Sequence, residues 1–340
     1  KIGAPNIVMG TAETLYPTVE SDGSFTINIP LYHHTQVRMM IGNADLVILL
    51  SPEKETNVAI NLSNPPGKQF VFSGQYATIN NEWCQPELIT KIPPVYSDGD
   101  LLDSIVGISA NEFKKRCINQ YKRYVTHNSA QLQFSEDTRT LANLSCAFDC
   151  LENLQATHYC LQTAYQKKEN ITREQAFAAF LDVYLPDDFH NYLKVFPVNH
   201  PLALYCYNYR NVVMDLYDTH KDPLAYEKNL LKNAPLTKEE QTLIHQYETA
   251  FKAGISFQQE SELMALSAKY FKENDQFRWE SFSKAKERLS NIIQDSTSLI
   301  VDYIRAIYMR SSFYNLQPLT PRQELMASEI TNPIFLGIIQ

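Results

Sequence analysis

The chain has 340 residues, which is long for one domain of ordinary size and favours two domains. Its hydrophobic content of 44% and charged content of 20% are typical of a folded protein and exclude a disordered chain. A net charge of −8 argues against a nucleic-acid binder, and only ten glycines argue against phosphate-binding loops and a large all-β protein.

The two ends of the sequence suggest a piece of a longer protein. It opens at Lys1 with no Met and no apolar export signal, and it stops within the apolar stretch 332–340 with no polar tail. No run approaches the roughly 18 apolar residues of a membrane span, so no membrane-spanning segment is expected. We expect the natural protein to continue beyond Gln340.

Residues 1–83 predict a small β module. Apolar residues alternate with polar ones or run together in five short segments, at residues 25–29, 37–41, 46–50, 58–62 and 70–72. The Asp22-Gly23 turn precedes the first segment, and Gly42-Asn43 ends the second. Short strands without a helical pattern between them predict an antiparallel β-sandwich over about residues 5–75.

A proline-rich connector at residues 84–108 leads into a predicted helical domain at residues 109–340. Helix starts are indicated by a Ser or Thr followed three residues later by Glu or Gln, at Ser109, Thr172, Thr237, Ser256 and Thr320. Apolar residues recur every three or four positions over 141–161 and 289–308, which predicts amphipathic helices. The expected fold class is α+β, with an N-terminal antiparallel β-sandwich and an all-helical region after it.

The C-terminal segment carries a further expectation. The helix that starts at Thr320 should end at Asn332-Pro333, because the residue before proline is disfavoured in a helix. The apolar residues after it should pack back on the helices or lead into a following domain, and the second alternative is favoured.

Six cysteines, at positions 84, 117, 146, 150, 160 and 206, raise the possibility of a metal or redox site. Cys146 and Cys150 share a helix face, but a zinc site needs paired ligands that converge from two elements. Their apolar neighbours favour free thiols packed in the core, with a structural disulfide as the lesser alternative. Trp83-Cys84-Gln85-Pro86 resembles the thioredoxin motif, but Glu87 stands where the second cysteine would be, so no dithiol exists.

Other polar residues give no catalytic constellation. Adjacent strand residues point to opposite faces, so His33 and His34 cannot easily share an ion, and a solvated loop pair is predicted. The acidic pairs Asp187-Asp188 and Glu239-Glu240 stand near predicted helix starts, where carboxylates bind free N–H groups. We assign no catalytic, cofactor-binding or metal-binding residue and expect this chain not to be an enzyme by itself.

Several segments are similar to those of a known family. Residues 21–32 resemble the "dGsFt" strand of a β-sandwich module of unknown function, residues 49–62 its "l-sPgd…v-i" pattern, and residues 72–82 its "f-sGs…n-e". In that family the module precedes a variable helical region and then a thioredoxin-like domain, in envelope thiol–disulfide oxidoreductases of the TlpA/ResA type. Residues 319–321 and 329–335 resemble the stretch before the thioredoxin-like domain.

This resemblance implies a location and a role. The chain would lie in the periplasm or cell envelope as a non-catalytic accessory region that positions the redox domain or binds its partners. Its partners would be proteins or a following thioredoxin-like domain, and the family's catalytic cysteines match no residue here. The alternative is a stand-alone envelope binding or scaffold protein of unknown ligand, and a hydrolase with unrecognised acids is a distant third.

Overall fold

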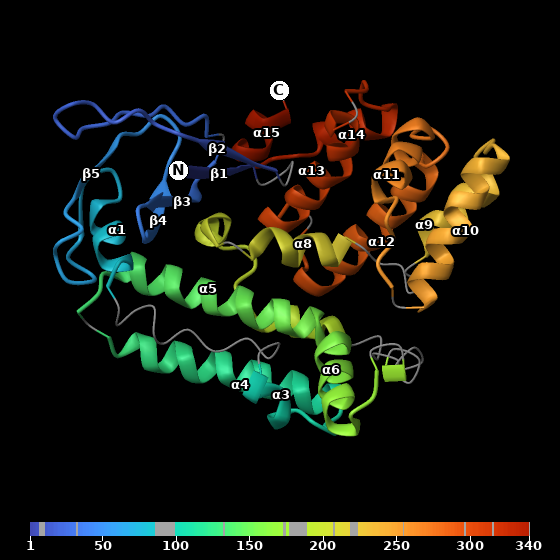
Figure 1. Ribbon diagram of the computed structural model, residues 1–340, viewed down its shortest axis with the longest axis horizontal. Helices are drawn as coiled ribbons and strands as arrows, with labels where there is room; N and C mark the ends of the chain where they lie inside the picture. The colour runs from blue at the N-terminus through green and yellow to red at the C-terminus, as the bar shows by residue number, and fades with distance from the viewer. Residues whose placement is uncertain are drawn as a thin grey trace.

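The fold is α+β, as predicted, with small antiparallel sheets near the N-terminus and helices after them (Figure 1). The computed structural model describes residues 1–6, 11–31, 33–85, 99–131, 133–172, 175–176, 189–206, 208–217, 224–253, 255–295, 297–314 and 316–339. None of the helices in these ranges is both long and apolar enough to cross a lipid bilayer.

The N-terminal part contains two separate sheets. The larger has the strand order β2-β1-β3-β4, and its strands are β1 (Ile2–Asn6), β2 (Thr11–Leu15), β3 (Thr35–Ile41) and β4 (Ala44–Leu50). The smaller pairs β5 (Thr56–Ile60) with β6 (Phe70–Gly74). Val37, Ile48 and Phe72 bring both sheets into one hydrophobic cluster, but among the described strands this arrangement is not a closed sandwich.

The predicted strand at residues 25–29 is not formed. The turn before it is present, because the backbone N–H of Ser24 donates to Asp22 Oδ1 over 2.9 Å. Phe25, Ile27 and Ile29 pack against the sheet cluster, as their alternation indicated. The prediction was wrong because a strand also needs a neighbouring backbone, and no described strand pairs with this segment.

A short helix that the sequence analysis did not anticipate, α1 (Ala77–Trp83), connects the two sheets. The amide of Asn80 accepts from the N–H of Leu49 over 2.8 Å and donates to its carbonyl over 3.1 Å. The next residue, Asn81, does the same at Phe72, with 2.8 and 3.1 Å. Each side-chain amide therefore makes the two backbone hydrogen bonds that a neighbouring strand would otherwise make, at one residue of β4 and one of β6.

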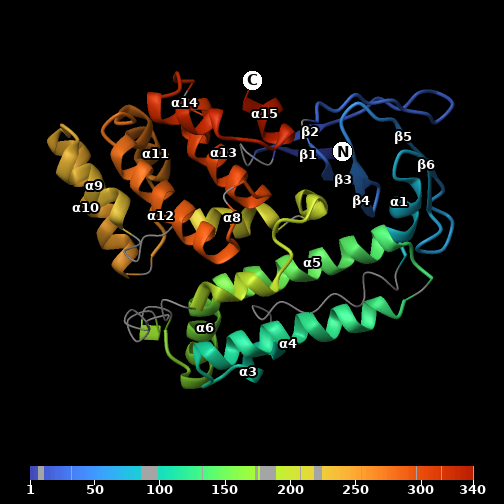
Figure 2. The same ribbon diagram turned by 180° about the vertical axis from the view of Figure 1, so that it is seen from behind.

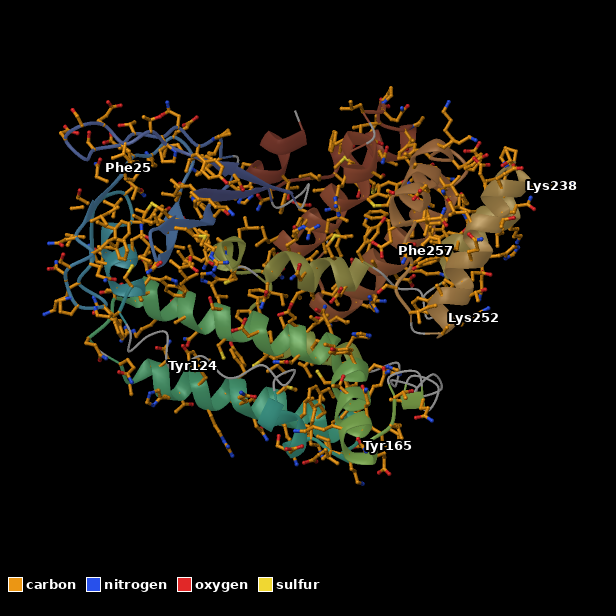
Figure 3. All side chains as sticks on the ribbon, in the orientation of Figure 1. Phe25, Tyr124, Tyr165, Lys238, Lys252 and Phe257 are labelled. Carbon is orange, nitrogen blue, oxygen red and sulfur yellow. The ribbon has the colours of Figure 1, made fainter. Side chains whose placement is uncertain are left out.

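The helical region extends along two sides of the molecule (Figures 1 and 2). Its elements are α3 (Gly99–Ser104), α4 (Ala110–Ser129), α5 (Glu136–Gln155), α6 (Thr157–Glu169), the 3₁₀ helices η1 (Phe189–Val195) and η2 (Pro201–Tyr205), α8 (Tyr209–Tyr217), α9 (Ala225–Asn233), α10 (Lys238–Ala253), α11 (Glu260–Lys269), α12 (Asp275–Ile293), α13 (Leu299–Tyr314), α14 (Pro321–Ser328) and α15 (Pro333–Ile339). Figure 1 shows the sheets at one end and α10 at the other, where Lys238 and Lys252 are labelled in Figure 3. Helix α3 lies inside the predicted connector 84–108, of which residues 86–98 are outside the described ranges.

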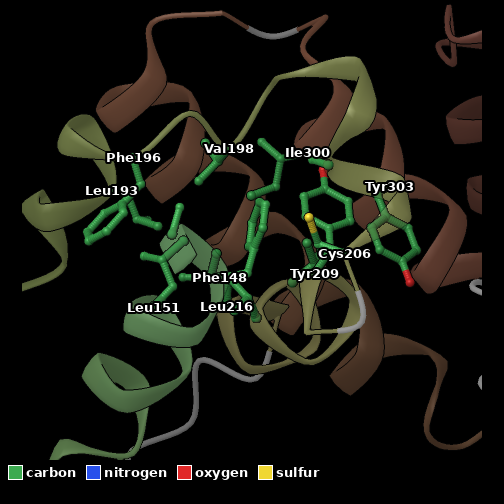
Figure 4. Close-up of a cluster of buried hydrophobic side chains, with 14 of the residues drawn as sticks. Phe148, Leu151, Leu193, Phe196, Val198, Cys206, Tyr209, Leu216, Ile300 and Tyr303 are labelled. Carbon is green, nitrogen blue, oxygen red and sulfur yellow. The ribbon is translucent and has the colours of Figure 1, made fainter. Parts of the chain in front are cut away.

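The main core is rich in aromatic side chains and includes residues from most of the helices. Figure 4 shows part of it. Tyr303 of α13 stacks on Tyr209 of α8 at 5.7 Å and on Phe335 of α15 at 5.2 Å between ring centroids. Leu49 of β4 and Ile79 of α1 belong to the same core. Sheet residues and helix residues are therefore buried together.

Most of the predicted helix starts are confirmed. The side chains of Ser109 and Thr320 cap α4 and α14, and Thr320 forms a complete capping box with Gln323. Thr172 and Thr237 each exchange hydrogen bonds with the residue three positions on. The start at Ser256 was wrong, because α11 begins at Glu260 with Gln259 before it.

The two apolar rows are each divided between two helices. The row at 141–161 breaks at Ala156, between α5 and α6, and the row at 289–308 is shared by α12 and α13. The amphipathic pattern thus located the helices but not the breaks, because the apolar face continues across each break.

The C-terminal residues differ from the expectation. Helix α14 already ends at Ser328, and Asn332-Pro333 starts α15, with Asn332 Oδ1 accepting from the N–H of Ile334 over 3.0 Å. Phe335 is fully buried against α13. Of the two expected alternatives, packing back on the helices is the one that the structure shows for this side chain.

Candidate binding site

A pocket of about 330 Å³ lies where the sheets meet the helices. Its lining residues come from β4, from the approach to β6, from the end of α1 and from the paired helices α4 and α5: Asp45, Leu46, Val47, Gly67, Gln69, Phe70, Trp83, Cys84, Tyr124 and Ala142. The volume is at the lower end of the roughly 300–1,000 Å³ of small-molecule sites. Such a space holds one or two large side chains.

Three aromatic rings give the pocket its apolar character. Phe70 precedes the centre of β6, Trp83 ends α1, and Tyr124, labelled in Figure 3, comes from α4. Trp83 also packs against Phe134 and Ala142, which fixes its position. Burial raises the pKa of the Tyr124 phenol above its usual range, so this hydroxyl keeps its proton.

Asp45 is the charged residue of the lining. The guanidinium of Arg38 donates to both of its carboxylate oxygens, with Nε at 2.8 and 3.0 Å. These hydrogen bonds lower the pKa of Asp45, so the carboxylate is ionised at neutral pH. The charge of the Asp45 carboxylate is therefore balanced at this side of the pocket by the guanidinium of Arg38.

Two strand edges open onto the pocket. The backbone groups of Leu49 point away from β3, since Asn80 binds them, and strand alternation points those of Val47 in the same direction. On β6, Asn81 binds the backbone groups of Phe72, which therefore point away from β5. Phe70 lies two residues earlier, so its backbone N–H and C=O point in the same direction. Within the described ranges, no hydrogen bond reaches the N–H or C=O of Val47 or Phe70.

Cys84 lies at this site but is not an activated thiol. It caps the C-terminal end of α1, and its N–H donates to the carbonyl of Asn80 over 3.3 Å. Burial raises its pKa to about 11, and the C-terminal end of a helix disfavours a thiolate. Trp83 and Cys84 therefore stand at the C-terminal end of a helix, whereas a redox-active thiol is activated at a helix N-terminus.

The remaining cysteines are core residues, as predicted. Cys117, Cys146, Cys150, Cys160 and Cys206 are buried, and each is a free thiol. Among the residues with described positions, no three His, Cys, Asp or Glu side chains are placed to share a metal ion.

The two histidines are not the solvated pair that was predicted. His33 is only 4% exposed, and His34 is half-buried, with its ring stacked on Tyr205 at 5.3 Å. His34 Nδ1 lies 2.8 Å from Ser51 Oγ, but no described carboxylate contacts this ring, so the pair lacks the orienting acid of a hydrolase triad. The prediction failed because η2 and α1 cover this end of β3, which no local pattern indicates.

In the second acidic pair, Glu240 has a structural role at the start of α10 and at its contact with the end of α11. Glu240 accepts from the N–H of Thr237 over 2.8 Å and from Lys269 Nζ over 2.6 Å, and the bond to Lys269 contributes most to lowering its pKa to about 2. Asp187 and Asp188 lie outside the described residues.

Sequence reasoning missed the pocket and the asparagine pair beside it. The available signal was Asn80-Asn81, two amides next to the apolar Ile79 in a segment with no strand pattern.

Neither a family model, nor a curated protein, nor a solved structure matches this chain.

Proposed function

We propose that the chain is a non-catalytic accessory region of an envelope thiol–disulfide oxidoreductase, and that it binds a partner of that enzyme or positions its redox domain. The proposal is supported by the resemblance of about residues 13–83 and 318–336 to the accessory regions of that family. The observation that carries the binding role is the aromatic pocket at the junction of sheets and helices.

The thiols of the chain favour a binding role over a redox one. A thiol that exchanges disulfides must be accessible and have a lowered pKa. Cys84 has a raised pKa, and the other five cysteines are buried in the core. Thiol chemistry would then be supplied by a thioredoxin-like domain, and the chain would lie in the periplasm or cell envelope with its parent enzyme.

An insulin-reduction assay tests the non-catalytic part of the proposal. The chain should reduce insulin in the presence of dithiothreitol no faster than a variant in which all six cysteines are replaced by serine or alanine. Cys84→Ser should leave folding intact. Faster reduction by the unchanged chain, lost in Cys84→Ser, would contradict a non-catalytic role.

A stand-alone envelope binding or scaffold protein remains the second candidate. It is favoured by one observation: the pocket is built from residues 45–142 of this chain and needs no redox domain to complete it. The coding sequence after Gln340 separates the two. A Trp-Cys-x-x-Cys motif there would support the accessory region, whereas a stop codon would support the second candidate.

A further inference from the structure

We propose that the pocket binds an extended peptide segment of a partner protein, which pairs with the open edge of β4 at Val47 and inserts one large apolar side chain among the rings. This inference deepens the binding role proposed above and rests on it, but it does not depend on the parent being an oxidoreductase.

The first argument is the state of the two strand edges. Val47 and Phe70 each present an N–H and a C=O that no described residue binds, and unpaired strand edges pair readily with another chain. Two residues further along each strand, Leu49 and Phe72 already bind the amides of Asn80 and Asn81. A peptide would continue the same hydrogen-bonding pattern where the asparagines stop.

The second argument is the shape and lining of the space. In an extended peptide every second side chain points to the same side, so a peptide paired with Val47 directs one side chain into the pocket. Trp83 and Tyr124 line that space, and its 330 Å³ accommodates a Phe, Leu or Trp side chain. Backbone pairing would give affinity, and the pocket would select the side chain.

The third argument is charge. The chain has a net charge of −8, and the Asp45 carboxylate that lines the pocket is already paired with Arg38. An acidic peptide would be repelled by the net charge of the chain, whereas Lys or Arg beside the apolar residue would be attracted by it. The expected partner segment is therefore extended, apolar at its centre and basic at its ends.

Fluorescence anisotropy with a labelled peptide, Lys-Thr-Val-Thr-Phe-Thr-Val-Thr-Lys, tests this proposal on the intact chain. We expect saturable binding that weakens at least about tenfold when the central Phe is replaced by Ser, since about 1.4 kcal/mol corresponds to a factor of ten. Two peptides N-methylated at alternate amides, in the two possible registers, test the backbone pairing. One of them should lose binding and the other should keep it.

Variants of the chain locate the site. Val47→Pro removes the backbone N–H of residue 47, which faces the pocket. This N–H does not take part in the pairing of β4 with β3, so the sheet keeps its hydrogen bonds. Peptide binding should weaken about tenfold. Val47→Ala keeps that N–H and controls for the lost side chain. Val71→Ser, on the neighbouring residue of β6 with a side chain 60% exposed, should bind as the unchanged chain does.

The outcomes separate this proposal from the proposed function. Equal binding of both N-methylated peptides and the parent peptide would overturn backbone pairing, even if Val47→Pro fails to fold. Concentration-dependent dimers of the chain that Val47→Pro abolishes would identify a second copy as the occupant and also overturn it. Neither result changes what the coding sequence and the insulin assay report on the accessory region.

Discussion

At the scale of single residues, Asn80 is a buried polar side chain that connects α1 to β4. It is fully buried, and both polar atoms of its amide bind the backbone of Leu49, which is itself 1% exposed. Asn80→Ala would leave a buried N–H and a buried C=O without partners. We expect a loss of about 2–4 kcal/mol in the free energy of unfolding, measured by urea denaturation.

Asn64 provides the matched control for that experiment. Its amide also donates to a backbone carbonyl, that of Lys68 over 3.0 Å, but on an exposed turn where water replaces the lost partner. Asn64→Ala should change the free energy of unfolding by less than about 0.5 kcal/mol. Equal losses in the two variants would mean that Asn80 is not a structural tie.

His190 on η1 should make stability depend on pH. Burial lowers its pKa to about 4, and the nearby charges of Arg288 and Lys114 act in the same direction. Above about pH 6.5 the ring is neutral in both the folded and the unfolded chain, so the free energy of unfolding is not reduced by this group. Between pH 6.5 and 4 the unfolded chain takes up a proton that the folded chain does not, so stability falls as the pH falls.

The variant His190→Gln isolates that contribution. When the pH falls from 6.5 to 4, the free energy of unfolding of this variant should decrease by about 2 kcal/mol less than that of the unchanged chain. Urea denaturation at each pH measures this difference. The exposed His245, replaced by Gln, is the control and should keep the full loss. An identical pH profile for His190→Gln and the unchanged chain would contradict the assignment.

At the scale of elements, Asp302 holds the segment that leads into α15. Its buried Oδ2 accepts from the N–H groups of Thr331 and Asn332 over 3.0 and 2.8 Å, and its Oδ1 accepts from Arg305 over 2.6 Å. Asp302→Asn leaves Arg305 without this buried partner charge. We expect the free energy of unfolding to decrease by about 3 kcal/mol. Hydrogen exchange over residues 331–339, measured by mass spectrometry, should become faster.

A second aspartate tests whether the effect is specific. Asp295 accepts from the N–H of Thr297 in an exposed turn, and Asp295→Asn should leave both stability and exchange nearly unchanged. If Asp302→Asn unfolds the chain, the more conservative Thr331→Val removes only the hydroxyl bond to Oδ2 and should still speed exchange in α15. Unchanged exchange in Thr331→Val would contradict the role of this network.

The elements that could be predicted from the sequence are those with local signals. The turn at Gly42-Asn43 and the caps at Ser109 and Thr320 depend on neighbours within a few residues, and all three are confirmed. Helix α1 was missed because its N-cap, Tyr76, has a left-handed backbone with φ 60° and no capping side chain. The pocket could not be predicted, because its residues meet only through long-range packing.

At the scale of the whole molecule, the shared core argues that the sheets and the helices packed around it form one cooperative unit. Leu49 and Ile79 are buried among helix residues, so the sheets cannot separate from the helices without exposing apolar surface. We expect one unfolding transition in urea, with the same midpoint by far-ultraviolet circular dichroism and by Trp83 fluorescence in a Trp279→Phe background. Two separate midpoints would instead support independent domains on either side of residues 84–108.

Helix α1 also implies an order of assembly. Three consecutive residues connect it to three elements: Asn81 to Phe72 across 9 residues of sequence, Asn80 to Leu49 across 31, and Glu82 to Ser135 across 53. Because the entropy lost on closing a loop rises with its length, we expect the contact to β6 to form first at the least cost, β4 to join next, and α5 to join last. One short helix would then bind its neighbours in the order of their distance along the chain, and the pocket would be complete only when α4 and α5 have packed beside it.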